Sequence, residues 1–180
     1  MVCLNKHNTF SILLTFTLLF NGCKGDKPKE QHQNQEINPE NLKKQFIKAN
    51  QQLVQKESDE MDYYAKSHQM PFITTTSGIR YYVYEPSPKG DSIKSGMLIT
   101  MDFRVSLLNG TEVYSSKESG KKTFKVGSEN IESGIQRGLQ YIKHGDKALF
   151  LIPSHLAHGL LGDSKKIPPQ MPIVYDVQIN

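Results

Sequence analysis

Cysteine is nearly absent from this chain: among 180 residues it occurs only as Cys3 and Cys23. If a leader containing Cys3 is removed on export, Cys23 has no partner. An internal disulfide is then excluded for the mature chain, even in an oxidising compartment. No carboxylate or thiol completes a convincing metal site with His144, His155 and His158. We therefore expect no metal site.

An excess of charge of one sign is also lacking. The chain has 22 Lys and Arg against 18 Asp and Glu, a formal net charge of +4. The lysines are scattered along the sequence, whereas a protein that binds nucleic acid gathers them into a basic face. We therefore expect no nucleic-acid partner.

Long hydrophobic runs are lacking too. The apolar run from Phe10 to Phe20 is about half the ~20 residues that a membrane-spanning helix needs, which excludes a permanent anchor of that kind. With Lys6 before it and Gly22 after it, the run is typical of a secretory signal peptide over residues 1–22.

A cysteine directly after the small residue Gly22 resembles a bacterial lipobox. This resemblance implies that Cys23 becomes the first mature residue and carries lipid, which also accounts for the unpaired thiol; two acyl chains give stable anchoring. We therefore expect a location in the cell envelope, with lipid anchoring to a membrane and the periplasmic side of the outer membrane favoured. The alternative is an ordinary secretory signal in which Cys23 is incidental.

The residues after Cys23 contain almost nothing apolar. Residues 23–37 are rich in Lys, Gln, Glu and Asn, a composition that cannot bury enough surface to become ordered. We interpret them as a flexible tether between the membrane and the rest of the chain.

A long amphipathic helix is predicted over residues 38–70. Asn38 is a favoured N-cap, Pro39 is tolerated at the first helical position, and Glu40 suits the positive end of the helix. Apolar residues recur on one face, although Glu57 interrupts this stripe. The stripe consists of Leu42, Phe46, Ala49 and Leu53. It either packs against the chain's own domain or pairs with a second copy in a homodimer.

Residues 71–180 have the pattern of an α+β domain. Residues 97–107 and 173–179 alternate between apolar and polar side chains, as half-buried strands do. Ile135, Leu139 and Ile142 lie on one face of a short helix. We expect five or six mostly antiparallel strands with this helix across one face. We also expect a fragment that starts near Met70 to fold without the stripe.

Three segments of this domain resemble FKBP-type peptidyl-prolyl cis-trans isomerases, in that family's order and near its spacing. They are Gly134-Ile135-Gln136-Arg137-Gly138-Leu139, Ile152-Pro153-Ser154-His155-Leu156-Ala157-His158-Gly159, and Ile167-Pro168-Pro169 followed by Tyr175-Asp176-Val177. The resemblance extends from about Ser95 to Asn180. It implies a curved sheet wrapped on one short helix, and a cleft that accelerates the rotation of X–Pro bonds without any cofactor.

The resemblance also assigns a pocket. Its implied catalytic residues are Phe103, Tyr114, His158 and Tyr175, and its implied substrate-binding residues are Val113, Ile131, Glu132, Ile135 and Ile167. Taken singly, most of these side chains are explained as well by ordinary core packing. Only the set favours a pocket.

This set departs from the family's usual residues. The family has Tyr at Phe103, Asp at Tyr114 and Trp at Ile135, so two polar groups are lost and the pocket floor is smaller. It has Tyr at His158, whose imidazole can replace the lost hydroxyl as a donor. At Glu132 the family uses the backbone N–H, which any residue except proline keeps.

The sequence therefore predicts a prolyl isomerase that acts on proline-containing exported polypeptides through a divergent, weakened pocket. The alternatives are a non-catalytic chaperone or binding lipoprotein with the same fold, and a structural lipoprotein that binds no ligand. The combination of leader, tether, helix and pocket resembles the gliding-motility-associated FKBP-like lipoproteins of Bacteroidetes. That resemblance implies a role in cell-surface machinery.

Overall fold

A computed structural model of the chain describes residues 38–128 and 131–180. The expected signal peptide, the lipid on Cys23 and the tether at 23–37 lie outside these residues. The described residues belong to one compact unit, Ile37–Asn180. None of their helices combines the length and hydropathy needed to cross a membrane.

A long helix precedes the sheet, as predicted. Helix α1 covers Pro39–Ser67, and the Asn38 side chain accepts a hydrogen bond from the N–H of Glu40 at 2.9 Å. The strands are β1 (Ile73–Thr74), β2 (Arg80–Glu85), β3 (Leu98–Leu107), β4 (Glu112–Ser115), β5 (Lys122–Lys125), β6 (Lys147–Ile152) and β7 (Ile173–Ile179). The short helical segments are α2 (Ser116–Ser119), α3 (Ser133–Gly138), η1 (Leu139–Tyr141) and η2 (Ser154–Leu156).

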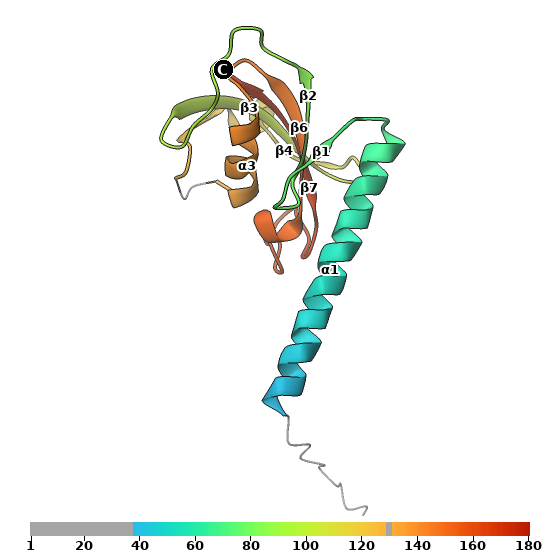
Figure 1. The fold of residues 1–180 in the computed structure, drawn as a ribbon. Helices are drawn as coiled ribbons and strands as arrows, with labels where there is room; N and C mark the ends of the chain where they lie inside the picture. The colour runs from blue at the N-terminus through green and yellow to red at the C-terminus, as the bar shows by residue number, and fades with distance from the viewer. Residues whose placement is uncertain (1–37, 129–130) are drawn as a thin grey trace, which may run out of the picture. The chain divides into compact units, whose positions relative to one another are not determined.

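The strands form a single antiparallel sheet in the order β1-β2-β6-β7-β3-β4, and β5 also pairs with β3 (Figure 1). The two-residue strand β1 brings the count to seven, one more than expected. Helix α3 lies against one face of the curved sheet. The α+β fold predicted from the sequence is therefore confirmed.

The alternation along the central strands divides the core between the two faces of the sheet. On β6, Ala148, Phe150 and Ile152 face the main core together with Ile135 of α3. The intervening Leu151 faces the other side and packs with Met61 of α1. Because α3 and α1 use opposite faces, the centre of the sheet is covered on both sides.

Helix α1 packs on the sheet through its C-terminal half only. Its two buried residues are Glu57 and Met61, whereas Leu42 and Phe46 are 39% and 61% exposed. Of the two alternatives for the stripe, packing against the chain's own domain is thus not observed for Leu42, Phe46 and Ala49. Glu57 does not interrupt the buried face; it is the polar centre of that face.

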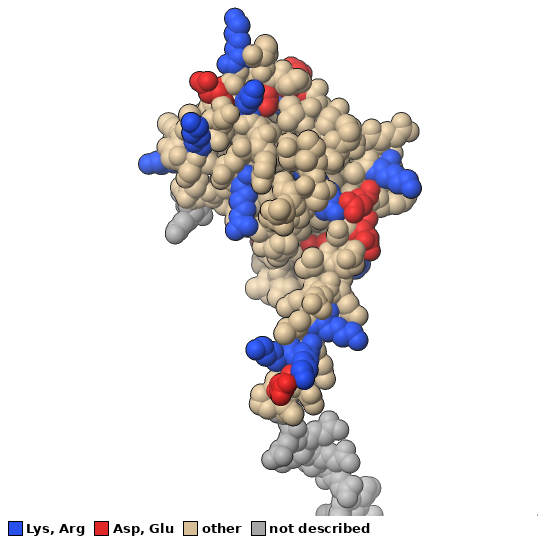
Figure 2. Space-filling view, in the orientation of Figure 1, with Lys and Arg blue, Asp and Glu red and all other residues tan. Residues whose placement is uncertain are grey.

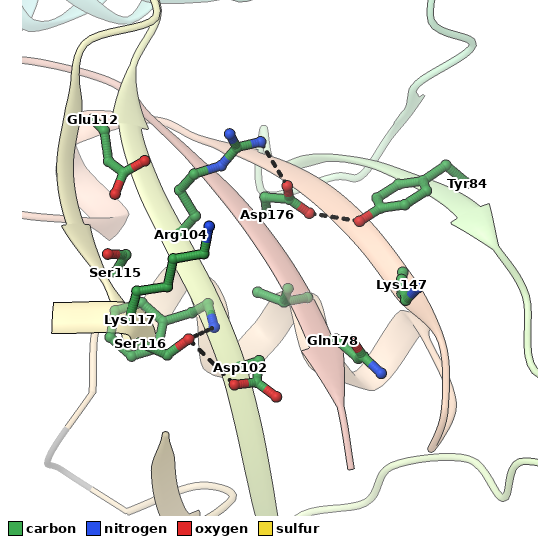
Figure 3. A pocket seen from close by; sticks show the side chains of 12 residues that line it. Tyr84, Asp102, Arg104, Glu112, Ser115, Ser116, Lys117, Lys147, Asp176 and Gln178 are labelled. Carbon is green, nitrogen blue, oxygen red and sulfur yellow. Dashed lines mark hydrogen bonds and ion pairs between the residues drawn. The ribbon is translucent and has the colours of Figure 1, made fainter. Parts of the chain in front are cut away.

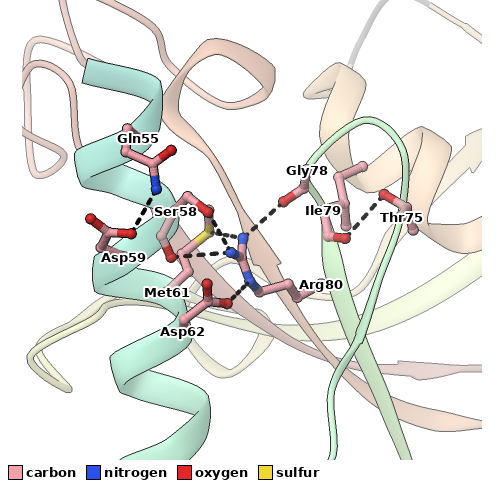
Figure 4. Close-up of polar contacts among 9 residues, drawn as sticks. All are labelled: Gln55, Ser58, Asp59, Met61, Asp62, Thr75, Gly78, Ile79 and Arg80. Atoms are coloured by element: carbon pink, nitrogen blue, oxygen red, sulfur yellow. Dashed lines mark hydrogen bonds and ion pairs between the residues drawn. The ribbon is translucent and has the colours of Figure 1, made fainter. Parts of the chain in front are cut away.

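A buried arginine fixes the same half of α1 to the start of β2. Arg80 is 3% exposed. Its guanidinium donates to the Asp62 carboxylate at 2.7 Å and to the Ser58 carbonyl and hydroxyl at 3.1 and 2.8 Å (Figure 4). A buried cation is tolerated only with partners of this kind. The helix is therefore part of the folded unit, which argues against a stable domain that begins near Met70.

The surface carries charges of both signs. On the face drawn in Figure 2, basic and acidic side chains are interspersed and most of the surface belongs to other residues.

Candidate functional site

Five of the predicted pocket residues meet in the main core, between α3 and the sheet. Phe103 comes from β3, Val113 from β4, Ile135 from α3 and Tyr175 from β7, and Ile167 comes from the loop before β7. The Phe103 and Tyr175 ring centroids are 6.5 Å apart. All five side chains are 0–5% exposed. The five residues that the sequence assigned to one site therefore belong to the same core, and the Phe103 and Tyr175 rings are neighbours within it.

The other four predicted residues form a partly exposed rim around this cluster. Tyr114 and Ile131 pack against the main core. The carboxylate of Glu132 lies 3.3 Å from Nε2 of His158, which follows η2. Glu132 is also the N-cap of α3, so its own N–H precedes the hydrogen-bond ladder of the helix.

The Tyr175 phenol lies at the base of this rim. Burial raises its pKa well above the usual value, and the negative charge of Glu132 raises it further. Tyr175 therefore stays a neutral hydroxyl at every pH at which the protein would work. The phenol can donate a hydrogen bond but does not act as a base.

The structure adds a carboxylate that the sequence did not assign. The resemblance places an Asp of the family at Tyr114, and the hydroxyl of Tyr114 donates to the Asp163 carboxylate. The same carboxylate accepts from the N–H groups of Lys165 and Ile167 at 2.9 and 2.8 Å. Burial alone would raise the pKa of Asp163, but these hydrogen bonds outweigh it and lower the pKa to about 2. A negative charge thus returns to the rim from the loop before Ile167.

Two lysines near the aromatic residues were also missed. The ammonium of Lys122 lies 5.1 Å from the centroid of the Phe103 ring. That of Lys166 lies 5.2 Å from the centroid of the Tyr114 ring. Both distances are within the range of cation–π attraction. The sequence carried one signal for Lys122: it precedes the apolar position 124 by two residues and so lies on the same face of β5.

Because the apolar cluster is closed, it can accept a ligand only if side chains of the rim move. Tyr114, Ile131, Glu132 and His158 are the partly exposed residues that would have to open. The cluster offers apolar surface, hydrogen-bond donors in Tyr175 and His158, and no nucleophile. Among the described residues, no group of three or more His, Cys, Asp or Glu side chains is placed to bind a metal together.

A separate polar cavity of about 340 Å³ lies on the opposite face of β3 and β7 (Figure 3). Its walls include Arg104 and Tyr84, which bind the two oxygens of Asp176, each at 2.8 Å. Burial, and then the hydrogen bond to Asp176, raises the pKa of Tyr84. Asp176 lies beside Tyr175 in β7 and points the other way, so the polar side chains of this cavity lie across the sheet from Tyr175, although Phe103 and Val177 of the main core also contribute to its lining.

Comparison with known proteins agrees with the resemblance seen in the sequence. A model of the FKBP-type peptidyl-prolyl cis-trans isomerase family matches residues 90–180. A probable FKBP-type peptidyl-prolyl cis-trans isomerase of Haemophilus influenzae is 34% identical over 106 residues, which are 59% of this chain and 43% of the relative. FkpA of Escherichia coli is 31% identical over 107 residues, which are 59% of this chain and 38% of FkpA. This chain thus matches less than half the length of either relative.

Solved structures give the same picture. The crystal structure of Escherichia coli FkpA superimposes with a TM-score of 0.59 at 26% identity, over 84% of this chain and 72% of that one. The crystal structure of AtFKBP13 superimposes with a TM-score of 0.55 at 26% identity, over 59% of this chain and 94% of that one. The family model covers half of the chain, and the described fold has the family's curved sheet and short helix. The chain therefore belongs to the FKBP-type peptidyl-prolyl cis-trans isomerase family.

Proposed function

We propose that this protein is a peptidyl-prolyl cis-trans isomerase whose divergent pocket makes it slower than relatives with the full aromatic set. The observation that carries the proposal is that Phe103, Val113, Ile135, Ile167 and Tyr175 are all buried in the one core between α3 and the sheet, with Tyr114 and Ile131 packed at its edge. The family relationship supports the reaction class.

The chemistry needs only a surface of this kind. The barrier to peptide rotation is ~18–20 kcal/mol because amide resonance gives the C–N bond partial double-bond character. Rotation weakens this resonance and reduces the charge separation between nitrogen and oxygen. An apolar cluster that holds the proline ring therefore stabilises the twisted amide relative to the planar one. His158 or the N–H of Glu132 orients the carbonyl before the proline.

The low rate follows from two features of the site. Phe103 lacks the hydroxyl that the resemblance implies, and a lost hydrogen bond is worth about 0.5–1.5 kcal/mol. The cluster is also closed, so the contact between Glu132 and His158 must open before a proline ring enters. Each 1.36 kcal/mol added to the barrier lowers the rate about tenfold, and we expect a deficit of one to two orders of magnitude.

The test is a protease-free isomerisation assay on a proline peptide, with three variants. Tyr175→Ala removes part of the cluster and should abolish acceleration, with folding checked by circular dichroism. Phe103→Tyr should raise the rate, because it restores a donor at the cluster. Arg104→Ala is the matched control: it changes the neighbouring residue of β3, whose side chain faces the polar cavity instead. If the wild-type protein neither accelerates isomerisation nor binds the peptide at millimolar concentration, the enzyme proposal fails. The alternative of a non-catalytic binding module then takes its place.

We also propose that the substrates are exported polypeptides and that lipid on Cys23 holds the enzyme at a membrane of the cell envelope. The support is the apolar run that ends in Gly22-Cys23. Cys23→Ser should release the protein from membranes or leave the precursor uncut. If Cys23→Ser is processed and localised like the wild type, Cys23 does not carry lipid. The resemblance to gliding-motility-associated lipoproteins makes parts of cell-surface machinery the first clients to test.

We propose, further, that the exposed N-terminal half of α1 pairs with a second copy. Its apolar residues Leu42, Phe46 and Ile47 are 39%, 61% and 47% exposed. Light scattering on the protein and on Phe46→Ser tests the pairing. A monomer at every concentration for the wild type would exclude it.

A further inference from the structure

One buried acidic side chain has no part in the reaction proposed above. Glu57 lies in the middle of α1 and is 2% exposed. Its carboxylate accepts two hydrogen bonds from Ser154, one from the backbone N–H at 2.8 Å and one from the hydroxyl at 2.5 Å. Ser154 is itself 3% exposed and lies 97 residues along the chain.

Ser154 is the first residue of η2, the turn that leads to His158. Its carbonyl accepts hydrogen bonds from the N–H groups of Ala157 and Gly159, at 2.9 and 2.7 Å. These two residues flank His158 on either side. A single serine therefore connects the carboxylate on α1 to both neighbours of the rim histidine.

The same turn also contacts the helix that carries Ile135. The carbonyl of Leu156 accepts a hydrogen bond from the Ser133 hydroxyl at 3.4 Å. It lies so near Gly134 that a Cβ atom there would approach it to 2.8 Å. The turn thus lies between α1 on one side and α3 on the other, and its position affects both His158 and the N-terminus of α3.

An apolar side chain at position 57 would complete the buried face with Met61. A buried carboxylate is instead costly unless its hydrogen bonds are made. Its two hydrogen bonds both go to the turn that leads to the rim. We propose that Glu57 is a positioning residue of the prolyl isomerase site: through Ser154, α1 holds the turn that places His158. This inference rests on the proposed function.

The structure supplies a matched control on the same helix. Asp62 is also an acidic residue of α1 that binds across to the domain, but its partner is Arg80 at the start of β2 (Figure 4). Asp62→Ala weakens the docking of α1 without removing a hydrogen bond from Ser154. It separates the general effect of a loosened helix from a specific effect on the turn.

The experiment uses the full chain and two readouts. The first is hydrogen exchange of the Ala157 and Gly159 amides, followed by NMR. The second is prolyl isomerisation, with kcat and KM determined separately. Glu57→Ala should speed the exchange of both amides and lower kcat/KM, each by about tenfold, the order expected when a hydrogen bond to a charged group is lost.

Three further variants make the result specific. Glu57→Gln, which keeps one acceptor oxygen, should recover part of both effects. Ser154→Ala, a milder change, should show a smaller effect in the same direction. The double variant Glu57→Ala/Ser154→Ala should be no worse than Glu57→Ala alone, because both changes break the same link. Asp62→Ala should leave both readouts near the wild type.

Equal effects of Glu57→Ala and Asp62→Ala on the two amides would overturn the proposal, since Glu57 would then be an anchor of α1 and nothing more. Unchanged amide exchange in Glu57→Ala and Ser154→Ala would also overturn it. If the wild-type protein does not accelerate isomerisation, the proposed function fails. The exchange readout then shows separately whether Glu57 holds the turn.

Discussion

At the scale of single residues, the site differs from its family less by what is missing than by what has replaced it. The carboxylate expected at position 114 is absent, but Asp163 brings one to the hydroxyl of Tyr114. His158 stands in place of a tyrosine and faces Glu132. Each replacement adds a polar or charged group, so the rim is more polar than an aromatic rim would be.

The Tyr114–Asp163 pair should lose its contribution to the stability of the protein in strong acid. The pKa of Asp163 in the folded chain is lowered to about 2, below the ordinary value of ~3.9. Its contribution is therefore complete above about pH 4 and is lost as the pH falls toward 2. Since Asp163 is only partly buried and water screens its charge, we expect Asp163→Asn to cost about 1 kcal/mol or less at pH 7.

Urea unfolding of both proteins between pH 7 and pH 2 measures this difference. The two unfolding free energies should converge at the acid end. A difference that grows as the pH falls would show that the charge of Asp163 is not what stabilises the loop.

The sequence predicted the apolar members of the site well, because each lies in a motif of fixed order or on a strand with clear alternation. Phe103 and Tyr175 are examples. It could not predict Asp163, since a loop between two motifs has no periodicity that shows where a side chain points. The prediction for Glu57 was also wrong, because a charged residue in an apolar helical pattern is expected to be exposed. Its buried partner Ser154 can be identified only from the three-dimensional structure.

At the scale of elements, the site depends on how closely α3 lies on β6. Gly134 and Gly138 are one helical turn apart and both face the sheet. A Cβ atom at Gly134 would come within 2.3 Å of Ile152, and one at Gly138 within 2.8 Å of the Phe150 ring. Neither distance is possible between real atoms, so the glycines allow Ile135 to reach the centre of the cluster.

Gly138→Ala should therefore lower the free energy of unfolding by about 1–3 kcal/mol, the usual cost of overpacking a core. The gain in helix propensity from Ala, ~1 kcal/mol at most, offsets only part of this cost. Arg137→Ala, at the exposed neighbouring position, should change stability by no more than about 0.5 kcal/mol. Chemical denaturation of the two variants compares these values. Equal stability would mean that α3 can shift outward freely.

At the scale of the whole molecule, α1 is a helix of two halves. The half before Leu53 is exposed, and the half after it packs Met61 against Leu151 and Val174 of the sheet. The sequence predicted the length of the helix and the fold of the domain. It did not predict that α1 covers the face of the sheet that carries Leu151 and Val174. Both residues look like ordinary members of two strongly apolar strands.

Two truncations should separate these halves. A fragment that starts at Gln52 keeps Glu57 and Met61 and should unfold near the temperature of the longer chain. A fragment that starts at Met70 should be less stable by at least the ~2–5 kcal/mol that loss of a buried methionine side chain costs. Calorimetry of both fragments gives the comparison. Equal melting temperatures would show that α1 contributes little to the fold.

We propose above all that the closed apolar cluster between α3 and the sheet is a working prolyl-isomerase site. The most direct measurement is the rate of cis-to-trans exchange of a proline peptide, followed by NMR without a coupled protease, for the wild-type protein, Tyr175→Ala and Arg104→Ala at equal folded concentration. We predict acceleration by the wild-type protein and by Arg104→Ala, and none by Tyr175→Ala. Acceleration that survives in folded Tyr175→Ala, or no acceleration by the wild-type protein, would contradict the account.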